Sequence, residues 1–105
     1  MKLLHPCWPL ALIGAMAGAH AQPTSGTLQL RSLAATCAAC HGTDGRAVPD
    51  AGILGLRGRD RNELAARLLA FRDGTRPATV MHQIAKGYTL EQIDQLSAYF
   101  AGLPR

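Results

Sequence analysis

The chain has 105 residues, of which 48% are hydrophobic and 17% are charged, and its formal net charge is +4 at pH 7. This length predicts one small domain, and domains of this size often need a cofactor, metal or disulfide to complete the core. With only two Phe and two Tyr, the chain has few platforms for stacking bases, and nothing in it resembles a nucleic-acid-binding surface.

Residues 1–21 have the pattern of a secretory signal peptide. Lys2 provides a positive start, residues 10–17 form an apolar stretch, and residues 19–21 read Ala-His-Ala, an A-x-A cleavage site. We therefore predict that residues 22–105 form a single mature domain in the periplasm, with no stable insertion into the membrane. An uncleaved membrane anchor is the alternative.

The first predicted element of the mature chain is a helix over residues 28–39. Leu30, Ala34 and Cys37 recur in it at helical spacing. The next segment, residues 42–58, holds five glycines and a proline and is predicted to be a loop. Because this loop is long for so small a domain, we expect it to wrap around a large apolar group.

Two capping boxes predict helices in the second half of the chain. The first, Asp60–Glu63, begins a helix that ends at Gly74, and the second, Thr89–Gln92, begins the last helix. A short helix is predicted between them over residues 79–86. The inward face of the last helix is predicted to comprise Leu90, Ile93, Leu96, Phe100 and Leu103. No segment alternates with a period of two, so the predicted fold is all-α.

Cys37, Cys40 and His41 form the sequence Cys-x-x-Cys-His. In a helix these residues stand at i, i+3 and i+4, so their side chains project from one face. This arrangement suits two thioether bonds to one haem with the histidine on its iron. Two alternatives remain: a structural zinc site with His82 as a fourth ligand, and a redox dithiol. The spacing, the predicted export and the helical setting favour the haem.

With this motif, the chain resembles the class I cytochromes c over residues 28–103. The resemblance implies a small helical fold wrapped around one covalently bound haem c. It implies that Cys37 and Cys40 are the thioether sites and that His41 is the proximal iron ligand. It also implies that a proline carbonyl in the following loop accepts a hydrogen bond from His41, and the expected acceptor is Pro49 or a nearby carbonyl.

Met81 and His82 compete as the distal iron ligand. Met81 is the only methionine in residues 22–105, and it follows a turn just before the last helix, where class I cytochromes similarly place their ligand. On a helix, neighbouring side chains diverge by about 100°, so the two cannot both face one iron. We predict Met81, which would give a higher reduction potential than a second histidine.

A finer resemblance lies in residues 79–89, Thr-Val-Met-His-Gln-Ile-Ala-Lys-Gly-Tyr-Thr. This segment is similar to the cytochrome subunit of flavocytochrome c sulfide dehydrogenase. The resemblance implies an electron-transfer protein, not itself an enzyme, that accepts electrons from an FAD-containing flavoprotein oxidising sulfide. A free periplasmic shuttle of the c4 or c5 type is the alternative. If Met81 does not bind the iron, a third alternative is a five-coordinate haem that binds small gases.

A loose group of basic residues bears on the choice of partner. We interpret this group as a solvated face, and the functional alternative is a salt-sensitive docking rim for an acidic redox partner. The group comprises Arg46, Arg57, Arg59, Arg61 and Arg67.

Overall fold

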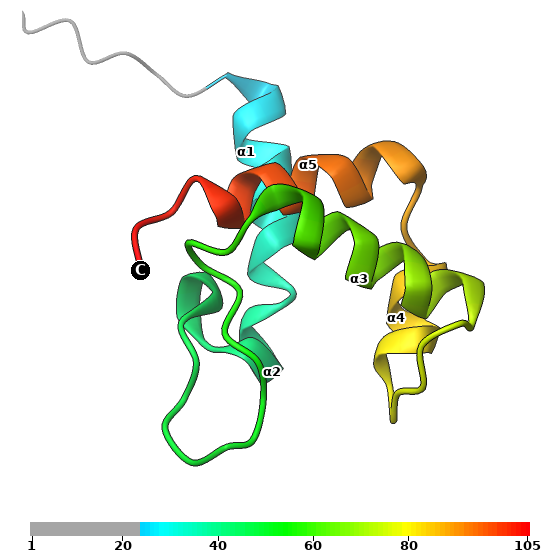
Figure 1. Ribbon diagram of the computed structural model, residues 1–105. Coiled ribbons are helices and arrows are strands. Elements are labelled where there is room, and N and C mark those ends of the chain that lie inside the picture. Colours follow the sequence, from blue (N-terminus) through cyan, green and yellow to red (C-terminus); the bar gives the residue numbers. More distant parts are fainter. Residues whose placement is uncertain (1–23) are drawn as a thin grey trace, which may run out of the picture.

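The computed structural model describes residues 24–105, so the predicted signal peptide lies outside the described residues (Figure 1). The described residues form five α-helices and one short 3-10 helix and contain no strand, which confirms the predicted all-α fold. No helix among them is long and apolar enough to cross a membrane. The elements are α1 (Ser25–Ala35), α2 (Ala38–His41), η1 (Thr43–Gly45), α3 (Arg61–Asp73), α4 (Met81–Lys86) and α5 (Leu90–Ala101).

The predicted helix over residues 28–39 is wrong in one respect, because a turn at Thr36 and Cys37 divides it into α1 and α2. The N–H groups of Thr36 and Cys37 donate to carbonyls three residues back, at 3.2 and 3.1 Å, which tightens the chain. The Thr36 hydroxyl also donates to the Leu33 carbonyl at 2.7 Å, a local bond that competes with helix continuation. Helical bonding resumes where the His41 N–H donates to the Cys37 carbonyl at 2.9 Å.

Both predicted helix caps are present, but only the second is a complete capping box. The Asp60 side chain accepts from the Glu63 N–H at 2.9 Å, whereas the Glu63 carboxylate binds arginine side chains instead of the Asp60 N–H. At α5, Thr89 and Gln92 form both reciprocal bonds, at 2.9 and 3.1 Å. Helix α3 ends at Gly74 as predicted, in a left-handed conformation with φ 78°.

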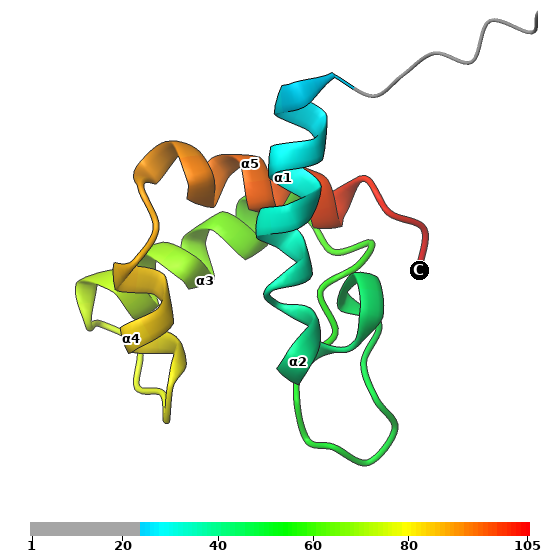
Figure 2. The same ribbon diagram turned by 180° about the vertical axis from the view of Figure 1, so that it is seen from behind.

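Helix α5 packs on both α1 and α3, and α4 packs on α3 (Figures 1 and 2). The Tyr99 and Phe100 rings meet edge to face, with centroids 5.2 Å apart, near the crossing of α1 and α5. This packing forms a small core, whose buried members are Ala34, Leu64, Leu96 and Phe100.

The predicted inward face of α5 is correct except at its first residue. Ile93, Leu96 and Phe100 are buried and Leu103 is half-buried, but Leu90 is 63% exposed. Leu90 opens the helix directly after its N-cap, beyond the end of the core. Helix α4 begins at Met81, two residues later than predicted, and ends at Lys86 as predicted.

The long loop from Gly42 to Gly58 is tied to the core through Gly45. The Leu56 N–H donates to the Gly45 carbonyl at 2.7 Å, and the Gly58 N–H donates to the Phe100 carbonyl at 2.8 Å. Gly45 has φ +71°, and a Cβ there would lie 2.8 Å from Leu56 Cβ and 2.9 Å from Phe100 Cδ1. The loop, η1 and α5 therefore meet where only glycine fits.

We expect Gly45→Ala to lower the free energy of unfolding by about 2–5 kcal/mol, because a left-handed alanine costs about 1–2 kcal/mol and overpacking adds about 1–3 kcal/mol. Gly74→Ala is the matched control, since Gly74 has φ +78° with nothing within 4 Å of an added Cβ. The control should lose only the part of the free energy of unfolding that comes from the left-handed backbone conformation. Urea unfolding followed by circular dichroism measures both, and equal losses would contradict the close packing around Gly45.

Candidate functional site

One cavity of about 580 Å³ is lined by all four predicted site residues. Cys37, Cys40 and His41 reach it from the start and body of α2, and Met81 reaches it from the first turn of α4. In both views, α2 and the long loop lie near the N-terminal end of α3, and α4 lies near the C-terminal end of α3 (Figures 1 and 2). The volume falls within the range of about 300–1,000 Å³ that is usual for cofactor sites.

The walls of this cavity are largely apolar, and part of the core forms them. Leu64, Leu96 and Phe100 belong both to the core cluster and to the cavity lining. Ser97 is a buried polar residue in the wall, and its hydroxyl donates to the Ile93 carbonyl at 2.7 Å. This bond satisfies the hydroxyl, so the wall presents little unpaired polarity to an apolar ligand.

The His41 ring is oriented by a hydrogen bond to the long loop. Its Nδ1 lies 2.6 Å from the carbonyl oxygen of Leu54. A carbonyl only accepts, so Nδ1 carries the proton and donates, and Nε2 is left with a free lone pair for a metal. The acceptor is therefore the nearby carbonyl of Leu54 and not that of Pro49, which lies in the exposed part of the loop.

The two cysteines differ in their surroundings. Cys37 is half-buried, Cys40 is exposed, and both thiols are free. Burial raises the pKa of the Cys37 thiol above its ordinary value, although hydrogen bonds with Thr36 and Tyr88 act in the opposite direction. Reactive dithiols depend on a lowered thiol pKa, so this environment does not favour the redox alternative.

The zinc alternative requires several ligands to converge on one point. In residues 24–105, no group of three His, Cys, Asp or Glu side chains is placed to hold a metal ion. His82, the proposed fourth ligand, is not among the residues that line the cavity, and its Nδ1 is buried without a hydrogen-bond partner. The arrangement therefore lacks the closed set of four ligands that a structural zinc site uses.

The residues present fit a covalently attached haem. Two thiols and a histidine on one helical turn face a large apolar cavity, and a thioether reaches the same cavity from another helix. The cavity lining also includes two cationic side chains, Arg67 and Arg76, which suit the carboxylate groups that a haem carries. The sequence gives no sign that Arg67, a member of the basic group, or Arg76 lines the cavity, because neither belongs to a recognisable motif.

The chain is similar to several curated cytochromes and electron acceptors, while no protein-family model matches. It is 38% identical over 73 residues to the cytochrome subunit of sulfide dehydrogenase from Chlorobaculum tepidum, a match that covers 70% of this chain and 64% of the relative. It is 40% identical over 70 residues to a thiosulfate dehydrogenase electron acceptor from Thiomonas intermedia, covering 67% of this chain and 32% of the relative. It is 36% identical over 69 residues to cytochrome c-554(548) from Halomonas halodenitrificans, covering 63% of this chain and 82% of the relative.

The placement of Met81 in the cavity and of His82 outside its lining leads to a spectroscopic prediction. Met81→Ala should abolish the weak far-red absorption band that ferric iron shows when methionine sulfur is its ligand. His82→Ala is the neighbouring control and should keep the band. The measurement is the absorption spectrum of each oxidised, haem-loaded variant, and loss of the band in His82→Ala alone would contradict the assignment.

Proposed function

The chain belongs to the class I c-type cytochromes, electron carriers whose cofactor is covalently bound haem c, and from this premise we propose that it is a periplasmic carrier that accepts single electrons from an FAD-containing, sulfide-oxidising flavoprotein. The observation that carries the proposal is the single cavity that joins the Cys-x-x-Cys-His turn to Met81 across the apolar core.

Four side chains are assigned roles at this cavity. Cys37 and Cys40 would form the two thioether bonds to the haem, and His41 through Nε2 and Met81 through its sulfur would hold the iron. When bound, haem c supplies a reversible one-electron change at its iron. With His41 and Met81 both holding the iron, no coordination position would be left for a substrate, so the chain would act as a carrier rather than as a catalyst.

The surroundings of these ligands adjust how readily the site accepts an electron. The apolar side chains of Leu64, Leu96 and Phe100 lower the polarity of the cavity, and low polarity disfavours the form that carries the greater charge. The Leu54 carbonyl pulls on the Nδ1 proton of His41 and makes the ring a stronger electron donor, which acts in the opposite sense.

The exposed rim of the cavity supports docking through an apolar surface. Ile53, Val80 and Ile84 line the cavity and are 40%, 51% and 42% exposed. Ile53 comes from the long loop, whereas Val80 and Ile84 come from the start and body of α4, so the rim draws on two separate segments. Exposed apolar side chains gathered at a site in this way are typical of protein contacts.

The basic residues give less support to a salt-steered docking rim. Arg59 and Arg67 both pair with Glu63, and Arg61 pairs with Asp94 at 2.7 Å. These two carboxylates hold three of the five arginines and offset part of their charge, which leaves less of it to attract an acidic partner. This favours a lasting complex with a larger redox protein, as the name of the Chlorobaculum relative suggests for that protein.

A free electron shuttle is the second candidate function. It is favoured by the likeness to cytochrome c-554(548), of which the match covers 82%. A shuttle should purify alone, whereas a haem subunit should copurify with a flavin-containing chain.

Native purification followed by anaerobic addition of sulfide distinguishes the two functions. For the proposed complex we expect haem bands with a flavin contribution, and we expect sulfide to reduce the haem. Haem bands alone, unchanged by sulfide, would instead identify a free carrier, and absence of haem bands would overturn both.

Val80→Thr should weaken the flavoprotein complex roughly fivefold, because it makes polar a half-exposed side chain whose burial contributes about 1 kcal/mol. Leu90→Thr is the matched control, since Leu90 is 63% exposed and does not line the cavity. The measurement is the cytochrome concentration that gives half-maximal reduction by the flavoprotein. Equal effects of the two substitutions would contradict docking at this rim.

A further inference from the structure

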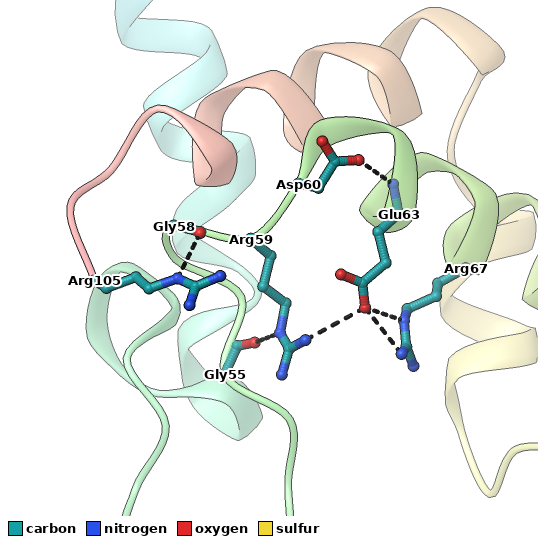
Figure 3. A network of polar contacts seen from close by, with 7 residues as sticks. All are labelled: Gly55, Gly58, Arg59, Asp60, Glu63, Arg67 and Arg105. Atoms are coloured by element: carbon teal, nitrogen blue, oxygen red, sulfur yellow. Dashed lines mark hydrogen bonds and ion pairs between the residues drawn. The ribbon is translucent and has the colours of Figure 1, made fainter.

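A network of polar contacts connects α3 to the loop segment that orients His41 (Figure 3). Arg59 Nε donates to the Gly55 carbonyl at 2.6 Å, and Arg59 Nη1 donates to Glu63 Oε1 at 3.3 Å. The same Glu63 oxygen accepts from Arg67 Nε at 3.0 Å and lies 2.9 Å from Arg67 Nη2. Arg67 lines the cavity, so the network extends from the cavity wall to the loop.

The carbonyl that Arg59 holds is the one directly after the acceptor of the His41 bond. The Gly55 carbonyl and the Leu56 N–H belong to one planar peptide unit. Arg59 binds the carbonyl end of this unit, and the Gly45 carbonyl accepts from its N–H end at 2.7 Å. Both ends of the plane are therefore fixed.

Only the two backbone dihedrals of Gly55 separate this fixed plane from the Leu54 carbonyl. Glycine has the greatest backbone freedom of any residue, so Gly55 by itself restrains the Leu54 carbonyl poorly. A bond to the next peptide plane supplies the restraint that a side chain at this position would otherwise provide. The direction of the Leu54 carbonyl toward His41 Nδ1, at 2.6 Å, then depends on the plane that Arg59 holds.

We propose that Arg59, itself held by Glu63, is a positioning residue for the His41 ring. It fixes the peptide plane after Leu54 and so keeps the Leu54 carbonyl directed at Nδ1. This inference rests on the proposed role of His41 as the proximal ligand.

The position of Glu63 supports this role. Its backbone N–H is bound by the Asp60 side chain, but its carboxylate does not return to the Asp60 N–H as a complete capping box requires. The Glu63 carboxylate lies between the side chains of Arg59 and Arg67. The side chain of Glu63 is 37% exposed, that of Arg59 is 32% exposed and that of Arg67 is 31% exposed. Partial burial strengthens ion pairs relative to a fully exposed surface, and two cations hold the carboxylate from opposite sides along the helix.

The expected consequence is electronic as well as structural. A well-directed carbonyl draws on the Nδ1 proton and makes the imidazole a stronger donor to a metal, which favours the oxidised state. Releasing the carbonyl should therefore raise the reduction potential. Removing the positive charge of Arg59 would act in the opposite direction, so an informative substitution must keep the charge and lose only the planar, multiply bonding guanidinium.

Arg59→Lys meets this requirement. In the haem-loaded protein we expect the His41 ring N–H to exchange with deuterium roughly tenfold faster, the factor that corresponds to loss of about one hydrogen bond, and the reduction potential to rise. Nuclear magnetic resonance measures the exchange of this hyperfine-shifted proton, and electrochemical titration measures the potential. Glu63→Gln, which removes the anchor of Arg59, should also accelerate the exchange, and the double variant should show less than the sum of the two effects.

Arg61→Lys is the matched control, because Arg61 begins α3 but pairs with Asp94 on α5. It should leave both readouts at the wild-type values. If Arg59→Lys and Glu63→Gln lower the stability but exchange the ring proton at the Arg61→Lys rate, the positioning role is overturned. Absence of a hyperfine-shifted His41 ring proton from the wild-type protein would instead overturn the ligand assignment, before any variant is compared.

Discussion

The fold depends on a core that is also the wall of a cavity. The buried hydrophobic side chains of the described residues are Ala34, Leu64, Ala85, Ile93, Leu96 and Phe100, and two of these six are alanines. Leu64, Leu96 and Phe100 turn one side toward a cavity of about 580 Å³. An apolar group in this cavity would complete the burial of these side chains, which small domains seldom achieve by themselves. Covalently bound haem c, the cofactor of the family, is such a group.

The remaining elements hold the proposed haem-binding residues around this cavity. Helix α4 packs on α3 and begins at Met81, while α2 packs on η1 and carries the cysteines and His41. The loop between α2 and α3 is tied down near the core by backbone bonds at Gly45 and Gly58. Rigid support of this kind matters for a carrier, because a site that changes little between its two charge states needs little reorganisation when an electron arrives.

Local signals predicted those parts of the fold that depend on neighbouring residues. The Asp60 and Thr89 caps and the Gly74 stop follow from side chains within one turn of each helix end, and all three are present.

The break at Thr36 was missed because a threonine is compatible with a helix and the bond of its hydroxyl to the Leu33 carbonyl is only one of the hydrogen bonds that it can make. The acceptor of the His41 hydrogen bond could not be predicted from the sequence for another reason. Every residue has a backbone carbonyl, so no residue type identifies the carbonyl of Leu54 as the acceptor. The arginine partners of Glu63 stand four residues before and after it, a spacing that is visible in the sequence, but the capping-box pattern assigned the Glu63 carboxylate to the Asp60 N–H instead.

The central proposal is that His41 on α2 and Met81 on α4 would be the two protein ligands of the haem iron. Near-infrared magnetic circular dichroism of the oxidised, natively purified protein tests it most directly, because the energy of the charge-transfer band identifies the pair of axial ligands. We expect the band of a low-spin iron with one histidine and one methionine ligand. A band typical of two histidines, or the signature of a high-spin five-coordinate iron, would contradict this account of the cavity.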